Sequence, residues 1–236
     1  MKAVITGGSR GIGREIALAF AREGATVIAC SRNTGYLEKL HEALVVANPE
    51  GKHRCLPADC SRREDLLSFF EQVQQNNEII DVLVNNAGMY RQAGLLEEPE
   101  GLLEEMLDLN VFSAYHCSRF FSKGMKKQGR GHIFNICSIA SLQAVPTAGA
   151  YTVSKHALLG LSRTLREELR PFGVKVTAVI PGATMTSSWE GSDPVDTRHL
   201  MEPADIASAV LNAFRMGPGA NVDELRINPL AAPPSR

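Results

Sequence analysis

The stretch AVITGGSRGIGREIALAFAREG, residues 3–24, decides the fold class. It contains a short apolar run, AVIT, then a glycine-rich turn, then a long amphipathic run. A short apolar run bounded by a turn is typical of a buried strand, and the longer run has the apolar spacing of a helix. A glycine-rich turn between a strand and a helix offers backbone N–H groups that can hold a pyrophosphate. The alternative is a plain glycine-rich turn, but its place after the first strand favours cofactor binding.

Strands and helices alternate along the rest of the chain. Further strands are expected at 26–30, 53–59, 80–88, 131–138, 174–182 and 223–228, and helices at 12–24, 35–48, 63–75, 101–128, 151–170 and 204–215. Strands that are apolar without alternation are typical of a parallel sheet covered by helices on both faces. The alternation therefore predicts a single doubly wound α/β domain.

The composition limits the classes of protein and partner. The chain has 236 residues, of which 44% are hydrophobic and 22% charged, and its formal net charge is −1. This charge gives no electrostatic reason to expect nucleic acid or an anionic membrane as a partner. No run of about 20 apolar residues is present that could span a membrane. Because the first expected strand follows Met1 directly, we expect no signal peptide and a cytoplasmic location.

The cysteines do not indicate a disulfide framework or a metal centre. They are five in number, at positions 30, 55, 60, 117 and 137, and their spacing is irregular. An odd number with irregular spacing argues against paired disulfides. His53, Cys55 and Cys60 lie close together in sequence, but no second ligand pair follows at zinc spacing. We therefore expect no bound metal, and cysteines that serve mostly as small core residues.

The end of the second expected strand, ACSRN (29–33), carries Ser31 and Arg32 and no carboxylate. Dehydrogenases that use NAD often place an acidic side chain there, which binds the ribose diol. An arginine can instead clamp a 2′-phosphate, because its fork geometry suits that group. Arg10 in the glycine-rich turn is a second candidate. The pattern favours NADP over NAD, although either arginine could simply be solvated.

The stretch AYTVSKHALLG (150–160) places a phenol and an ammonium group four residues apart on an expected helix. Residues at this spacing lie on one helix face, so Tyr151 and Lys155 would point into the same space. A nearby positive charge lowers the pKa of a phenol. The pair could then donate and accept a proton near neutral pH. Taken alone, the two residues would more simply belong to a solvated helix surface, and His156 would point away from them.

Polar residues close two of the expected strands. NNAG (85–88) ends the fourth strand and Ser138 ends the fifth, at the edge of the sheet that also carries the glycine-rich turn. Asn110 falls within the helix expected over 101–128, where its side chain or a distorted carbonyl could bind water. Cys137 precedes Ser138 and is expected to point to the opposite side of the strand.

These pieces together resemble one known family. They are TGGSRGIG (6–13), Asp59, NNAG (85–88), Asn110, Ser138, YTVSK (151–155) and PGATMT (181–186). Their order and spacing are similar to those of the classical short-chain dehydrogenases/reductases, from Lys2 to about Pro229. The resemblance implies a single Rossmann-like domain around a seven-stranded parallel sheet. Its cofactor-binding half would cover about 1–130 and its catalytic and substrate half about 131–230.

The resemblance also implies roles for individual residues. Asn110, Ser138, Tyr151 and Lys155 would form the catalytic set: Ser138 would hold the substrate oxygen, Tyr151 would transfer the proton, Lys155 would lower the pKa of Tyr151 and bind the nicotinamide ribose, and Asn110 would anchor a water molecule. Asp59 would hold the adenine amine. The residues expected to bind the cofactor are Gly7, Ser9, Arg10, Gly11, Ile12, Gly13, Ser31, Arg32, Asp59, Cys60, Asn86, Ala87, Gly88, Tyr151, Lys155, Pro181, Gly182, Thr184 and Thr186.

The function implied is that of an NADP(H)-dependent oxidoreductase, which reduces a small-molecule ketone to a secondary alcohol or catalyses the reverse reaction. Reduction of 3-oxoacyl thioesters or of a sepiapterin-type ketone are specific alternatives. A non-catalytic dinucleotide-binding protein is the alternative of a different class, and it would be expected to lose Tyr151 or Lys155. A homo-oligomer, tetramer or dimer, is expected through the helices at about 103–128 and 151–170. The irregular stretch 184–202, which contains Trp189, is expected to shape the substrate site.

Overall fold

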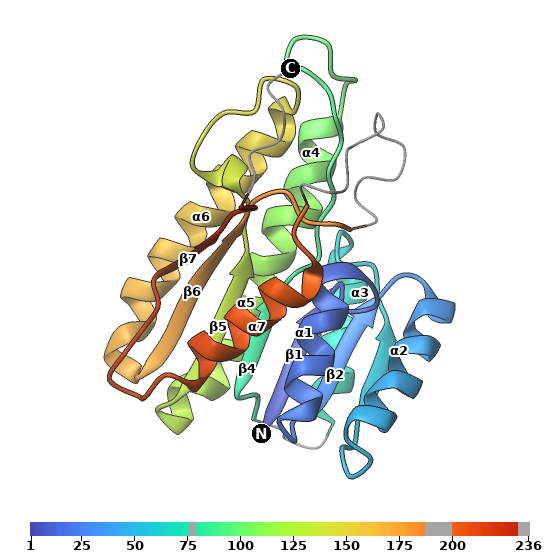
Figure 1. The fold of residues 1–236 in the computed structure, drawn as a ribbon, viewed down its shortest axis with the longest axis vertical. Coiled ribbons are helices and arrows are strands. Elements are labelled where there is room, and N and C mark those ends of the chain that lie inside the picture. The colour runs from blue at the N-terminus through green and yellow to red at the C-terminus, as the bar shows by residue number, and fades with distance from the viewer. Residues whose placement is uncertain (76–78, 187–199, 231–236) are drawn as a thin grey trace.

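The computed structural model describes residues 1–75, 79–186 and 200–230, and a seven-stranded parallel sheet forms its centre (Figure 1). The strands are β1 (Lys2–Thr6), β2 (Thr26–Ser31), β3 (Arg54–Pro57), β4 (Val82–Asn85), β5 (Gly131–Ile136), β6 (Val174–Pro181) and β7 (Glu224–Ile227). Their order across the sheet is β3-β2-β1-β4-β5-β6-β7. The direction of strand order reverses between β1 and β4, and open α/β sheets bind ligands at such a point.

Helices connect the strands. They are α1 (Gly11–Arg22), α2 (Thr34–Ala47), α3 (Arg63–Gln74), α4 (Leu102–Leu107), α5 (Ser113–Gln128), α6 (Gly149–Leu169) and α7 (Pro203–Arg215), with a π-helical turn η1 (Asp108–Phe112) and short 3-10 turns η2 (Ile139–Ser141) and η3 (Arg170–Phe172). In Figure 1, α1 and α7 lie together in front of the sheet. Within the described ranges, no helix is both long and apolar enough to cross a bilayer.

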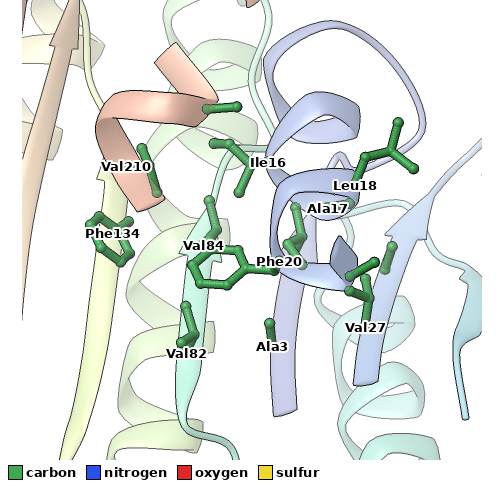
Figure 2. Packing of buried hydrophobic residues seen from close by; sticks show 14 of the residues in the cluster. Ala3, Ile16, Ala17, Leu18, Phe20, Val27, Val82, Val84, Phe134 and Val210 are labelled. Atoms are coloured by element: carbon green, nitrogen blue, oxygen red, sulfur yellow. The ribbon is translucent and has the colours of Figure 1, made fainter. Parts of the chain in front are cut away.

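Two apolar cores lie on opposite faces of the sheet. Successive side chains of a strand point to opposite faces, so Ala3 packs with α1, α2 and α7, whereas Val4 packs with α3, α5 and the end of α6. Figure 2 shows the first core, where Phe20 of α1 and Phe134 of β5 are both fully buried. Burying one such side chain contributes about 1.5–3 kcal/mol. The two cores fix the helices on the sheet and so fix the loops at its carboxyl edge.

The predicted doubly wound fold with its seven-stranded parallel sheet is confirmed, but several element boundaries differ. The strands predicted at 53–59, 80–88 and 131–138 end earlier, because the polar residues that follow each apolar run form loops instead of continuing the sheet. The single helix predicted over 101–128 is wrong. It is α4, η1 and α5 in succession, and the extra residue of the π-helical turn lies around Asn110. Such turns are frequent at functional sites.

Candidate active site

A cavity of about 570 Å³ opens at the carboxyl ends of the strands. It is lined by residues that follow β1, β2, β3, β4, β5 and β6, so chain segments far apart in sequence meet there. All of the expected catalytic and cofactor residues line this cavity except Gly13, Asp59 and Asn110. The size falls in the range of small-molecule and cofactor sites.

The glycine-rich turn forms one end of the cavity. Gly7 and Gly11 have φ of +62° and +53°, a conformation that favours glycine. A Cβ atom on Gly7 would lie 2.9 Å from the Cα of Ala87, so a side chain would displace the segment that follows β4. Within the described part of the chain, the N-cap residue Arg10 supplies no side-chain cap for the first N–H groups of α1. The bare turn and open helix N-terminus fit the pyrophosphate of a dinucleotide.

Gly13 and Asn86 support this turn from behind. The Asn86 side chain donates to the carbonyl oxygens of Thr6 and Gly7, at 3.1 and 2.9 Å. A Cβ on Gly13 would lie 2.3 Å from the Asn86 amide nitrogen and 2.5 Å from the Gly7 carbonyl oxygen. Gly13 therefore lets α1 pack closely on the turn, and it does not face the cavity.

The predicted 2′-phosphate end contains arginines. Arg10 lies over the ring of Tyr36, with its guanidinium carbon 4.8 Å from the ring centroid. Arg32 lies 3.9 Å from the Asp59 carboxylate, and its side chain is 68% exposed. The Ser9 hydroxyl donates to the Ser31 hydroxyl at 2.7 Å. Among the described lining residues there is no carboxylate.

Asp59 lies outside the cavity lining, although it was expected to hold the adenine amine. Its Oδ1 accepts hydrogen bonds from the backbone N–H and the hydroxyl of Ser61, at 2.9 and 2.7 Å. Its backbone N–H donates to Asp65 at 3.0 Å. The carboxylate therefore holds the turn after β3 and faces Arg32, while its contact with adenine stays a prediction.

The other end of the cavity brings Ser138, Tyr151 and Lys155 together. The Ser138 hydroxyl accepts a hydrogen bond from the Ala140 N–H, and the backbone N–H of Ser138 donates to the Ser141 hydroxyl, both at 3.2 Å. This capping of η2 fixes the serine beside Tyr151, where its hydroxyl acts to lower the pKa of the phenol. The arrangement places a hydroxyl, a phenol and an amine along one wall of the cavity.

Burial controls the protonation of this group. Lys155 is only 6% exposed, and its Nζ donates to the Ile136 carbonyl at 2.9 Å. Burial lowers the pKa of Lys155 to about 8, because it removes the ammonium from water. Burial likewise raises the pKa of Tyr151 to about 12, and the Ser138 hydroxyl offsets only part of that rise.

The net shift of the Tyr151 pKa is upward in this structure, with burial as its largest cause, so the lowering expected from Lys155 stays a prediction. The two residues do share one face, as the helical spacing predicts, and the Lys155 Nζ lies 5.7 Å from the Tyr151 ring centroid. However, that amine is directed to the Ile136 carbonyl, and desolvation of the phenol is the larger effect.

Asn110 lies one layer behind the cavity and is 1% exposed. Its side chain accepts from the Met89 N–H at 2.8 Å and donates to the Met89 carbonyl at 3.1 Å and to the Ser154 hydroxyl at 3.0 Å. The amide thus joins the loop after β4 to the helix that carries Tyr151. Because protein groups occupy the side chain, the water expected at Asn110 would use the carbonyl of the π-helical turn, and this stays a prediction.

A buried polar network lies beneath the site. The Asn85 amide donates to Asn135 at 2.7 Å and to Ser118 at 2.9 Å, and the Asn135 amide donates to Ser162 at 2.8 Å. These bonds join the ends of β4 and β5 to α5 and α6. Sequence reasoning did not assign the network a role, although an asparagine within each of two apolar strands was a visible signal.

Cys137 was expected on the opposite side of its strand, but it lines the cavity. β5 ends at Ile136, so strand alternation no longer governs the next side chain. The thiol is 2% exposed, and its burial raises its pKa, while the charge of Lys155 acts in the opposite direction. All five cysteines are free, and the sulfurs of Cys30 and Cys60 lie 3.6 Å apart.

Sequence reasoning also missed Met89 and Tyr90, which line the cavity after NNAG. The Tyr90 ring meets the Tyr151 ring edge to face, with centroids 5.0 Å apart and planes at 88°. His156, by contrast, is exposed on α6, as predicted. The predicted substrate stretch 184–202 is described only at its ends, which pair through Met185 N–H and Met201 O at 2.8 Å. Trp189 lies outside the described residues.

Comparison with known proteins agrees with the fold and the cavity described above. Residues 1–195 match the family model for short chain dehydrogenase. The farnesol dehydrogenase of Aedes aegypti is 36% identical over 234 residues, which cover 97% of this chain and 95% of that protein.

Two solved structures are also similar. The alcohol dehydrogenase of the archaeon Thermococcus sibiricus, complexed with 5-hydroxy-NADP, has a TM-score of 0.90 and 30% identity and covers 100% of this chain and 99% of its own. A metagenomic short-chain oxidoreductase in complex with NADP has a TM-score of 0.84 and 31% identity, with 98% of both chains covered. The fold, the cavity and these matches together show that the chain belongs to the short-chain dehydrogenase/reductase family.

Proposed function

We propose that this protein is an NADP(H)-dependent oxidoreductase that reduces a ketone to a secondary alcohol or catalyses the reverse reaction. The observation that carries the proposal is the shared cavity. Ser138, Tyr151 and Lys155 line one end of it, and a glycine-rich turn with an open helix N-terminus lines the other. A bound nicotinamide supplies or accepts the hydride, and the protein supplies orientation and proton transfer.

The protonation states suit Tyr151 as the proton donor. With a pKa of about 12 the phenol is protonated at neutral pH, and with a pKa of about 8 the Lys155 amine is mostly charged. The Ser138 hydroxyl holds the substrate oxygen, and the phenol then delivers its proton to that oxygen. The ammonium group stabilises the phenolate that remains. General acid catalysis of this kind contributes about 10²–10⁴-fold.

The preference for NADP(H) is supported by charge at the opposite end. Arg10 and Arg32 line the cavity beside Ser31, without a carboxylate among the described lining residues to repel a 2′-phosphate. A guanidinium binds phosphate through paired donors. The two similar structures named above hold 5-hydroxy-NADP and NADP.

We also propose that the protein forms a homo-oligomer through α5 and α6. Three large apolar or aromatic side chains are exposed on this side of the chain: Phe112 is 48% exposed, Tyr115 38% and Val153 43%. A contiguous exposed apolar surface marks a contact between protein subunits, and we propose that these three side chains belong to one.

The reaction is tested by an NADPH-oxidation screen over diketones, 3-oxoacyl thioesters, pterins and isoprenoid carbonyls. Tyr151→Phe keeps the ring but removes the proton, so turnover is expected to fall by at least about 100-fold while the Kd for NADPH stays within about twofold. Turnover near that of the wild type in this variant would exclude Tyr151 as the donor. NADPH binding without turnover of any carbonyl would favour the non-catalytic alternative.

The cofactor preference is tested by Arg32→Ala. Loss of a guanidinium that binds the 2′-phosphate should raise the Kd for NADPH by about tenfold to a hundredfold, while the Kd for NADH stays nearly constant. An equal rise for both nucleotides would remove the 2′-phosphate role of Arg32.

A further inference from the structure

We propose that Tyr90 selects the substrate and that it favours uncharged ketones and alcohols with an apolar body. The inference rests on the proposed function, because it concerns the molecule whose oxygen contacts Ser138 and Tyr151. Tyr90 follows NNAG and lines the same end of the cavity as Tyr151. Tyr90 is not among the residues expected to act in catalysis or to bind the cofactor.

The position of Tyr90 places it against any molecule bound at the reactive group. Its ring centroid lies 5.0 Å from that of Tyr151, and the two planes cross at 88°. The two phenols are close enough that Tyr90 contributes to the raised pKa of Tyr151. Tyr90 itself is partly buried, and this burial raises its pKa, so it presents a neutral phenol to the cavity.

Apolar side chains line the cavity that Tyr90 enters. They include those of Met89, Val145 and Ala183. Three of the described lining residues are charged, namely Lys155, Arg10 and Arg32. The two arginines belong to the glycine-rich turn and the end of β2, so only Lys155 lies at this end. A carboxylate on the substrate body would leave water beside these apolar residues. The one described cation at this end, Lys155, already donates to the Ile136 carbonyl, so burying the carboxylate is costly. An apolar body would instead pack on the Tyr90 ring.

The segment that carries Tyr90 is held firmly relative to Tyr151. Met89 is bound through both its N–H and its carbonyl to Asn110. Farther along, the Gly149 N–H donates to the Ala93 carbonyl at 2.9 Å, and the Glu98 carboxylate accepts from the Ala150 N–H at 3.0 Å.

Gly149 makes this close contact possible. A Cβ at that position would lie 2.7 Å from the Cα of Leu95. The segment is thus fixed at both ends to elements that also position Tyr151. A fixed wall discriminates between substrates better than a mobile one, because less ordering is needed on binding.

The test compares an alkyl methyl ketone with the same ketone carrying a terminal carboxylate. Wild-type enzyme should prefer the uncharged ketone in kcat/KM. Tyr90→Ala should lower kcat/KM for that ketone by about tenfold to a hundredfold and leave the carboxylated ketone nearly unchanged, because only the apolar body uses the ring. Tyr90→Arg should shift the preference towards the carboxylated ketone, and Tyr90→Phe should keep the wild-type ratio.

Leu96→Ala is the matched control, since Leu96 lies on the same segment and is 92% exposed. It should change neither ketone, and the Kd for NADPH should be the same in all variants. If Tyr90→Ala reduces both ketones by the same factor, Tyr90 is only a structural residue and the inference fails. A wild-type preference for the carboxylated ketone also overturns it. Wild-type enzyme that binds NADPH but reduces no ketone would instead refute the proposed function.

Discussion

Replacing Lys155 by methionine should stabilise the folded protein while it abolishes turnover. Burial lowers the pKa of Lys155 from 10.5 to about 8. Each pKa unit corresponds to about 1.36 kcal/mol, so keeping this amine charged inside the fold costs roughly 3 kcal/mol. Methionine fills a similar volume without a charge and loses only the hydrogen bond to the Ile136 carbonyl. We therefore expect a net gain of about 1–3 kcal/mol at neutral pH.

The pH dependence gives the prediction its sign. The folded state holds this proton less tightly than the unfolded state, so the penalty is fully present below about pH 8 and disappears as the pH rises towards 10.5. Urea unfolding of both proteins without nucleotide, at about pH 7 and about pH 10, measures this difference. The advantage of Lys155→Met should shrink by most of its value at the higher pH. At about 2–4 °C per kcal/mol, the rise in Tm at neutral pH is also measurable.

Lys123→Met is the control, because Lys123 is exposed on α5 and its charge remains in water. It should change neither the stability nor its pH dependence by more than about 0.5 kcal/mol. A variant at Lys155 that is less stable than the wild type at neutral pH would contradict the reasoning. So would an advantage that is equal at both pH values, since it could not come from the titration of the amine.

Two further predictions concern the glycine-rich turn and the core. Gly13→Ala should cost about 1–3 kcal/mol of stability and raise the Kd for NADPH at least tenfold, because the new Cβ would lie 2.5 Å from the Gly7 carbonyl oxygen. Unchanged NADPH binding by isothermal calorimetry would refute this. His132 bonds Thr177, and burial lowers the pKa of His132 from 6.5 to about 3. The free energy of unfolding should therefore fall by up to a few kcal/mol as the pH drops from about 6 to about 3. Urea unfolding of His132→Gln over the same range should show a smaller loss.

Much of the fold could be predicted because the relevant signals are local. Apolar runs and amphipathic periodicity depend on neighbouring residues alone, and they predicted every strand of the sheet. The π-helical turn around Asn110 could not be predicted in this way. Its side chain bonds Met89 and Ser154, which lie 21 and 44 residues away, so the distortion belongs to the packed structure and not to the local sequence.

In the candidate site, too, residues set by local spacing could be predicted, whereas those set by distant contacts could not. Helical spacing was enough to predict that Tyr151 and Lys155 share a face, and the glycine spacing was enough to predict the turn. Tyr90 could not be found, because it lies on an irregular segment whose course depends on contacts with Asn110 and Gly149. The sign of the Tyr151 pKa shift was also beyond sequence reasoning, since it depends on the balance of burial and charge at one oxygen atom.

That balance has a consequence for the direction of the reaction. Burial opposes charge on both groups, raising the pKa of Tyr151 to about 12 and lowering that of Lys155 to about 8. At neutral pH the phenol therefore keeps its proton and the amine is mostly charged, which is the state that a carbonyl reductase needs before each turnover. Oxidation of an alcohol needs the phenolate first, which is scarce at this pH. We therefore expect the site to favour reduction at neutral pH, and oxidation to gain relative to reduction as the pH rises.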